Sequence, residues 1–192
     1  MEAPAETLTD DVIVLRRWKP EQLSVLAEVA GDSAAHLGAW MIWATNGYGK
    51  QEAGEFLATT ARNWAEGKTY DFAIYADTAA AAEADTAAEA DAEGEVVGGT
   101  GMITHPDRIE IGYWLSRHHT GRGLATRAAR LLTAEAFRLG APEVEIRHDV
   151  KNVASGAVPA RLGFTMTGDE AAEPPLAPAC TGVNRIWRLK RP

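Results

Sequence analysis

The chain has 192 residues, of which 46% are hydrophobic and 24% charged, as expected for a soluble globular protein with a sizeable core. Its net charge of -8 argues against nucleic-acid binding, because affinity for phosphates requires clustered lysine and arginine. A single cysteine, Cys180, excludes an intrachain disulfide and a cysteine-based metal cluster. No apolar run approaches the roughly 20 residues needed to span a bilayer, and the acidic N-terminus lacks a signal peptide's apolar segment. We therefore expect a cytoplasmic protein that makes no membrane contact.

The N-terminal third is predicted to contain one strand and several helical segments. Residues 1–10 are expected to form a flexible tail, and the β-branched residues 11–18 favour a strand. Helical spacing of apolar residues predicts a helix over residues 21–30, and residues 33–43 form a second short helix or a turn rich in large side chains. Residues 50–67 have one apolar face and end in glycine, which predicts a longer helix.

The middle of the chain alternates between strands and one segment of unusual composition. Residues 70–77 alternate in polarity and predict a strand. Residues 78–95 contain almost only alanine, glutamate and aspartate and have no large apolar face, so we expect a disordered acidic insertion within a hairpin loop. An exposed short helix is the alternative. Strands are predicted again at residues 96–105 and 108–115.

The C-terminal half is predicted to contain two helices and further strands. Residues 124–139 carry apolar side chains at helical spacing, and residues 152–162 form a shorter helix. The further strands are predicted at residues 143–150, 164–167 and 183–190. No internal repeat and no long linker interrupts the pattern, so residues 11–192 are expected to form one domain.

A glycine-rich turn joins the strand at residues 108–115 to the following helix. The segment EIGYWLSRHHTGRGLA places Gly121 and Gly123 where the helix begins. The first helical turn has unpaired N–H groups, and glycines let a bulky anion approach them, while Arg122 can add a charged hydrogen bond. This predicts a cradle for a phosphate or pyrophosphate, although a glycine-rich turn can also bind nothing. The segment is neither a Walker A loop nor a dinucleotide fingerprint, whose third glycine is replaced here by Thr126.

Two longer segments carry a family resemblance. EIGYWLSRHHTGRGLATRAARLLTAEAF and EVEIRHDVKNVASGAVPARLGF resemble the GCN5-related N-acetyltransferases (GNAT), within them the branch of the ribosomal-protein acetyltransferases RimJ and RimL. In the family's loop pattern Q/R-x-x-G-x-G/A, Gly123 and Ala125 match, while Thr120 stands where Gln or Arg is commonest. The resemblance covers most of residues 11–190 apart from the acidic insertion.

The resemblance implies both the fold and the cofactor. The expected fold class is α+β, with a central mixed, mostly antiparallel twisted sheet flanked by helices and with splayed parallel strands that bind coenzyme A (CoA). The cofactor is expected to be acetyl-CoA, its pantetheine along a strand end and its pyrophosphate on the loop. The residues expected to contact it are Trp114, Leu115, Ser116, Thr120, Gly121, Arg122, Gly123, Leu124, Ala125, Thr126 and Asn152. Asn152 can equally cap a helix.

Two residues are the candidates for acid–base chemistry. Glu110 shares a strand face with Gly112 and Trp114, which indicates a cleft, and we expect it to act as the base directly or through a water. A solvent-facing surface glutamate is the alternative. The tyrosine acid that many family members carry is replaced by Pro159, and the resemblance to the RimL-like branch instead assigns Ser155 as the proton donor near the CoA sulfur. Ser155 can alternatively serve only to position the cofactor.

The resemblance places the acceptor near three aromatic residues. Trp40 and Trp43 are expected to line the acceptor cleft, and Tyr113 to lie beside the thioester. The acceptor is a primary amine, either a protein N-terminal α-amine or a small molecule. Transfer of another acyl group, such as succinyl, and a catalytically weak CoA-binding module remain alternatives. The histidines lack metal-ligand spacing, so no metal is expected, and a homodimer is left open because dimers are common in this branch.

Overall fold

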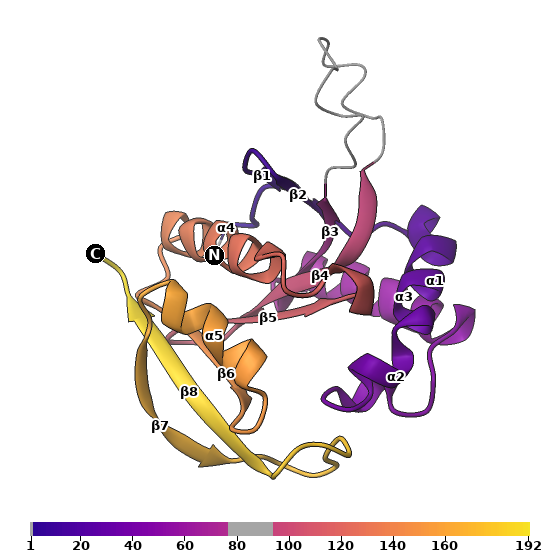
Figure 1. Ribbon diagram of the computed structural model, residues 1–192. Helices are drawn as coiled ribbons and strands as arrows, with labels where there is room; N and C mark the ends of the chain where they lie inside the picture. The colour runs from indigo at the N-terminus through magenta and orange to yellow at the C-terminus, as the bar shows by residue number, and fades with distance from the viewer. Residues whose placement is uncertain (1, 77–93) are drawn as a thin grey trace.

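The computed structural model describes residues 2–76 and 94–192. In this part of the chain one eight-stranded sheet has the order β1-β2-β3-β4-β5-β6-β8-β7 (Figure 1). The predicted acidic insertion at residues 78–95 lies outside the described residues except for its last two positions. The strands are β1 (Thr7–Thr9), β2 (Ile13–Arg17), β3 (Thr69–Ala76), β4 (Glu95–Thr104), β5 (Ile109–Leu115), β6 (Glu143–Asp149), β7 (Thr165–Ala171) and β8 (Val183–Lys190).

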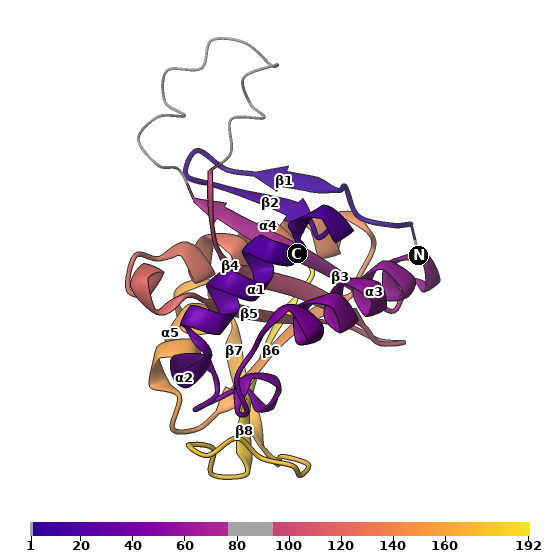
Figure 2. The same cartoon turned by 90° about the vertical axis from the view of Figure 1, so that its right-hand side faces the viewer.

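Helices cover both faces of the sheet. Figures 1 and 2 show α4 and α5 on one face and α1, α2 and α3 on the other. The α-helices are α1 (Leu23–Asp32), α2 (Ala34–Leu37), α3 (Lys50–Glu66), α4 (Leu124–Arg138) and α5 (Val153–Arg161). The 3-10 turns are η1 (Pro20–Gln22), η2 (Ile42–Ala44) and η5 (Arg117–His119). None of the described helices is long and apolar enough to cross a membrane.

The two faces of the sheet bury separate groups of apolar side chains. On the α4 face, Leu132 and Ala136 pack with Ile109 and Ile111 of β5, which alternate along the strand as the sequence pattern requires. On the other face, Leu26 of α1 and other side chains of α1 and α3 pack against β3 and β4. The sheet is thus buried on both sides, and its rigid strands can hold a site that opens on either face.

The only parallel strand pair among the described residues is β5 with β6, and its pairing is short. It consists of Ile109 opposite Val144 and Glu110 opposite Glu145, whereas every other neighbouring pair is antiparallel. Beyond Glu110 the two strands separate. The predicted α+β fold with splayed parallel strands is therefore confirmed.

Most predicted elements agree with the structure to within two residues, and the exceptions are at edges. The helix predicted at residues 50–67 is α3, and Gly67 ends it in the left-handed conformation with φ of 70°. Residues 1–10, expected as a flexible tail, include β1, which pairs with β2. β1 is only three residues long, which is too short for an alternating pattern to predict a strand. An ion pair of Glu6 with Arg17 at 2.7 Å lies beside this strand pair. β7 runs to Ala171, further than predicted, because its exposed residues carry no alternating pattern.

Candidate active site

Two cavities meet at the C-terminal end of β5. The first, of about 580 Å³, opens between α2, β5, the glycine loop, α4 and α5. The second, of about 680 Å³, lies on the opposite face of the sheet, between η2, α3 and strands β4 and β5. Met41, Tyr113 and Trp114 line both. A molecule in one cavity can therefore meet a molecule in the other at these three side chains.

The glycine loop gives the first cavity a row of exposed N–H groups. Gly121 and Gly123 have φ of 75° and 78°, a left-handed conformation that favours glycine, and α4 begins directly after Gly123. Within the described part of the chain, no acceptor is hydrogen-bonded to the N–H groups of residues 121–126. The N-terminal end of the α4 dipole adds positive potential at the same place. Unpaired N–H groups at the positive end of a helix are the features on which the prediction of an anion site depends.

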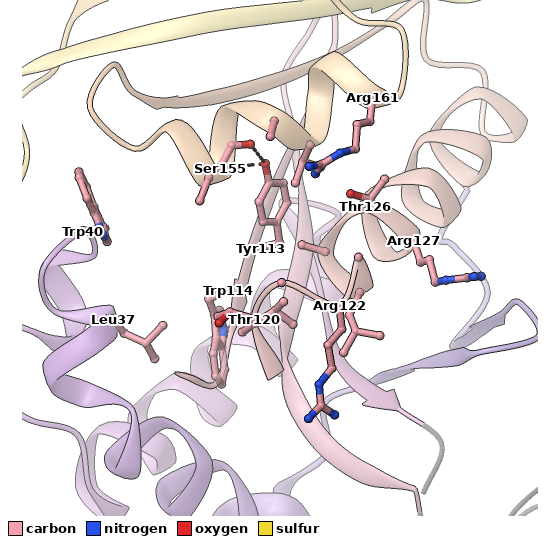
Figure 3. A pocket seen from close by; sticks show the side chains of 18 of the residues that line it. Leu37, Trp40, Tyr113, Trp114, Thr120, Arg122, Thr126, Arg127, Ser155 and Arg161 are labelled. Atoms are coloured by element: carbon pink, nitrogen blue, oxygen red, sulfur yellow. Dashed lines mark hydrogen bonds between the residues drawn. The ribbon is translucent and has the colours of Figure 1, made fainter. Parts of the chain in front are cut away.

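Arginines add positive charge around the same cavity. Arg122, Arg130 and Arg161 line it, and in the part of the chain that the structure describes none of them forms an ion pair. Arg127 also lines the cavity, but its Nη1 lies 2.9 Å from Asp10 Oδ2. Figure 3 shows Arg122, Arg127 and Arg161 on the side opposite Trp40. Sequence reasoning missed Arg130 and Arg161, and the signal that could have found Arg130 is its position two helical turns after Gly123.

Tyr113, which lines both cavities, and Ser155, which lines the first, bring two hydroxyl groups together. The Tyr113 hydroxyl donates to the main-chain oxygen of Ser155 at 2.9 Å, and Ser155 Oγ donates to the Tyr113 oxygen at 3.2 Å (Figure 3). Burial raises the pKa of Tyr113 to about 12, although the hydrogen bond with Ser155 acts in the opposite direction. The phenol therefore stays protonated at neutral pH.

The structure places most of the predicted site residues on the cavity walls. The first cavity is lined by Trp40, Tyr113, Trp114, Leu115, Thr120, Gly121, Arg122, Gly123, Leu124, Ala125, Thr126 and Ser155. Trp43 instead lines the second cavity, where its ring makes edge contacts with Trp114 and Tyr48. Trp40 and Trp43, predicted on one cleft, thus face different cavities because η2 turns the chain between them.

Three predicted residues are not among those that line a cavity. Asn152 Oδ1 accepts a hydrogen bond from Ser155 N at 3.2 Å and caps α5, so it holds Ser155 in place. The N–H of Ser116 donates to Val97 O, and its Oγ pairs with His119 Nδ1 at 2.7 Å. The third residue is Glu110.

Glu110 belongs to a network of charges where the β5–β6 pairing ends. Its carboxylate lies 3.2 Å from His105 Nε2 and 3.4 Å from Arg147 Nε. Arg147 also pairs with Glu145, whose fully buried carboxylate contacts the Nε atoms of Arg108 at 3.2 Å and Arg188 at 2.9 Å. Burial opposes ionisation of Glu145, but the hydrogen bond and charge of Arg147, with Arg108 and Arg188, lower its pKa. Glu110 lies two residues before Gly112 on β5, on the same face of the sheet as Gly112 and Trp114, which line the second cavity.

A family model for the acetyltransferase (GNAT) domain matches residues 13–165. The match includes β5, the glycine loop, α4 and α5, the elements that build the first cavity. The chain therefore belongs to the GNAT family. It is an acetyltransferase that uses acetyl-CoA, and the glycine loop with its arginines fits the anionic phosphates of that cofactor.

Within the family, the chain is similar to ribosomal-protein acetyltransferases. It is 30% identical over 165 residues to the Bacillus subtilis (strain 168) protein named "Putative ribosomal N-acetyltransferase YdaF", covering 81% of this chain and 79% of that protein. RimL, described as a ribosomal L7/L12 alpha-N-protein acetyltransferase in complex with coenzyme A, has a TM-score of 0.81 and 18% identity, covering 96% of this chain and 98% of RimL. MccE, a microcin C7 self immunity acetyltransferase in complex with acetyl-CoA and AMP, has a TM-score of 0.78 and 19% identity, covering 94% and 93%. Because RimL and MccE are only 18% and 19% identical to this chain, their similarity shows the fold alone.

Proposed function

We propose that this protein transfers an acetyl group from acetyl-CoA to a primary amine by direct attack, without a covalent enzyme intermediate. The observation that carries the proposal is that the two cavities share Met41, Tyr113 and Trp114, and that the Tyr113 hydroxyl is hydrogen-bonded to Ser155 on the wall of the first cavity. One cavity has the cationic loop that a diphosphate needs. The other opens from the opposite face of the sheet and leaves room for an acceptor, so donor and acceptor can be bound at the same time.

The first cavity would hold the cofactor along its whole length. The amides of residues 121–126 bind the pyrophosphate, and Arg122, Arg130 and Arg161 supply charge for the phosphates. The splayed end of β5, with Trp114 and Leu115 on the wall, receives the pantetheine. This arrangement directs the thioester toward Tyr113 and Ser155.

The chemistry requires a neutral amine and a leaving thiolate that accepts a proton. The amine nitrogen forms a bond to the thioester carbon, the carbon–sulfur bond then breaks, and the sulfur takes up a proton. Ser155 Oγ is the proposed proton donor: its hydroxyl, which donates to the Tyr113 oxygen in the structure, would turn to the sulfur, and Tyr113, which stays protonated, would then donate to the Ser155 oxygen and replace the proton it gives up. Asn152 fixes the position of Ser155 from the end of α5.

Glu110 is the proposed base that removes the amine proton. It shares the sheet face of the second cavity with Gly112 and Trp114, both of which line that cavity. Because its carboxylate is held between His105 and Arg147, it would act through a water molecule rather than by direct contact. The base role can be tested separately from the donor role.

Two classes of acceptor are proposed. A protein N-terminal α-amine is favoured by the similarity to YdaF and RimL, whose names specify ribosomal N-acetylation and the ribosomal protein L7/L12. A small-molecule amine is the second class, because the second cavity has the volume of a small-ligand site.

The test is thiol release from acetyl-CoA with a panel of N-terminal peptides and small amines, with mass spectrometry of the acceptor. We expect thiol release that depends on the acceptor, together with an equal amount of acetylated amine. Thiol release without an acetylated amine, or no release with any acceptor, would overturn the proposed function.

A further inference from the structure

The second cavity has apolar aromatic walls and carries negative charge. Aromatic rings of Trp18, Trp43, Tyr48, Phe56 and Trp114 line it. Its lining also includes three carboxylates, Glu52, Glu55 and Asp71, whereas none of the described residues that line it is lysine or arginine. Residues of α1 and α3 contribute to its lining, and Figures 1 and 2 show both helices on the sheet face opposite α4. Such walls suit a flat apolar molecule that carries positive charge.

Asp71 is the partly buried carboxylate of the three, whereas Glu52 and Glu55 are exposed. Its Oδ2 accepts hydrogen bonds from the hydroxyls of Thr60 at 2.6 Å and Thr69 at 3.0 Å. In the part of the chain described here, no donor contacts Oδ1. Glu52 and Glu55 likewise accept through one oxygen each, from Gly49 N and Gln51 Nε2, so partial burial is what distinguishes Asp71. Burial raises the pKa of Asp71, and the two threonine hydroxyls only partly offset this, so a cation nearby would stabilise its charged form.

A row of glycines opens the floor of the cavity beside Asp71. Asp71, Gly101 and Gly112 lie opposite one another across β3, β4 and β5. A Cβ at Gly101 would lie 2.5 Å from Asp71 Oδ1, so the carboxylate leans over this glycine. A Cβ at Gly112 would meet nothing within 4 Å, so the floor between Asp71 and β5 is open. A ligand can therefore lie over Gly112 with one end against the Asp71 carboxylate.

Asp71 lies too far from the reaction centre to bind the reacting nitrogen. Neighbouring strands are about 4.8 Å apart, so β3 is roughly 10 Å from β5, where Tyr113 joins the two cavities. An amine at the thioester is therefore separate from a cation at Asp71. A ligand that fills the space between them must carry two nitrogens, or one nitrogen and another cation.

We propose that the second cavity recognises an acceptor with a flat apolar body and a second positive charge, which Asp71 binds while the reacting amine lies at Tyr113 and Trp114. This inference rests on the proposed function, since it assigns the second cavity to the acceptor. It narrows both acceptor classes to molecules that carry a cation beyond the amine that is acetylated.

The test uses two amines that differ in one charge. 1,4-Bis(aminomethyl)benzene carries two aminomethyl groups on a ring, and 4-methylbenzylamine replaces one of them with methyl. We expect wild-type protein to acetylate the diamine with a kcat/KM at least about tenfold higher, as a charged hydrogen bond provides. In Asp71→Asn, whose amide oxygen can still accept from Thr60 and Thr69, the ratio should fall to about two, the number of equivalent amines in the diamine. Asp107→Asn, an exposed carboxylate paired with Arg108, is the matched control and should keep the wild-type ratio.

The outcomes separate this inference from the proposed function. If the wild-type protein acetylates both amines equally well, or if Asp71→Asn keeps the preference, Asp71 does not bind a second charge, although the acetyltransferase activity stands. If no amine or peptide is acetylated, the proposed function fails, and calorimetry then decides the inference alone. The diamine should bind the CoA-loaded protein at least about tenfold more tightly than it binds Asp71→Asn; no binding, or equal binding, would overturn it.

Discussion

Tyr113 places a phenol beside the helix that carries the proposed proton donor. Replacing it with phenylalanine removes the hydroxyl that accepts from Ser155 Oγ but keeps the ring on the cavity wall. We expect Tyr113→Phe and Ser155→Ala each to lower kcat by about 10- to 100-fold, at or below the lower end of the range for general acid catalysis. The KM for acetyl-CoA should change less than about twofold, because the loop amides remain. Because the pKa of Tyr113 is about 12, the wild-type rate should show no loss from this phenol below pH 11. Unchanged kcat in both variants would remove the pair from the chemistry.

Sequence reasoning found Tyr113 but not this contact. The position four residues before Gly163 is Pro159, so the tyrosine acid that many family members carry there was expected to be absent. The hydroxyl comes instead from β5, across a separation of 42 residues. Periodicity predicts which face of a strand a side chain occupies, but not which distant helix its tip will reach.

Asp71 should make stability depend on pH in a particular direction. Its pKa in the folded protein is raised above the ordinary 3.8, so the folded state binds more protons than the unfolded state between these two values. The free energy of unfolding of wild type relative to Asp71→Asn should therefore be highest at low pH and fall as pH rises through the raised pKa. Urea unfolding of both proteins from pH 3 to pH 8 measures the difference. A difference that rises with pH would contradict the burial argument.

At the scale of elements, the turn between β5 and α4 requires the left-handed conformation of Gly123, which residues with a side chain adopt only with strain. Gly123→Ala should strain the loop by about 1–2 kcal/mol and weaken CoA binding about tenfold or more in calorimetry. Gly140→Ala is a matched control at the other end of α4, where φ is 92° and a Cβ also meets nothing within 4 Å. The control should lose similar stability and keep its CoA affinity. Equal CoA affinity in both variants would argue against the loop as the pyrophosphate site.

Glu110, at the point where β5 and β6 separate, can act as the base or can only stabilise the fold through its charge network. One variant distinguishes the two roles. If Glu110 is the base, Glu110→Gln should lower turnover by about 100-fold at pH 7 and by much less at pH 9, where an α-amine with a pKa near 8 is already neutral. If it only completes the charge network with His105 and Arg147, the variant should lower Tm and leave kcat unchanged. Turnover and thermal unfolding of the same preparation decide between them. An equal loss of turnover at both pH values would exclude the base role.

Across the whole molecule, the sequence predicted the order of the elements better than the shape of the space between them. Apolar periodicity identified α3 and α4 nearly to the residue, because each buries one continuous face. The glycine loop was predicted because its chemistry is local. An acceptor cleft with Trp43 on its wall was expected, but the negative charge of the second cavity was not, because it comes from Asp71 on β3 and from carboxylates on α3 that only the folded sheet brings together. Sequence spacing also does not reveal that Glu110 and Arg147 pair across the end of a parallel ladder.

Met41, Tyr113 and Trp114 line both cavities, so the boundary between the cavities should limit the length of the acyl group that can be transferred. If the thioester lies at Tyr113 as proposed, carbon added to the donor beyond acetyl would extend past these side chains toward the space proposed for the amine. Propionyl-CoA and succinyl-CoA should therefore bind about as tightly as acetyl-CoA and yet be transferred at least about tenfold more slowly to a bulky amine, in competition assays with a fixed acceptor. The longer thioesters would then act as inhibitors whose potency rises with the size of the acceptor that they displace.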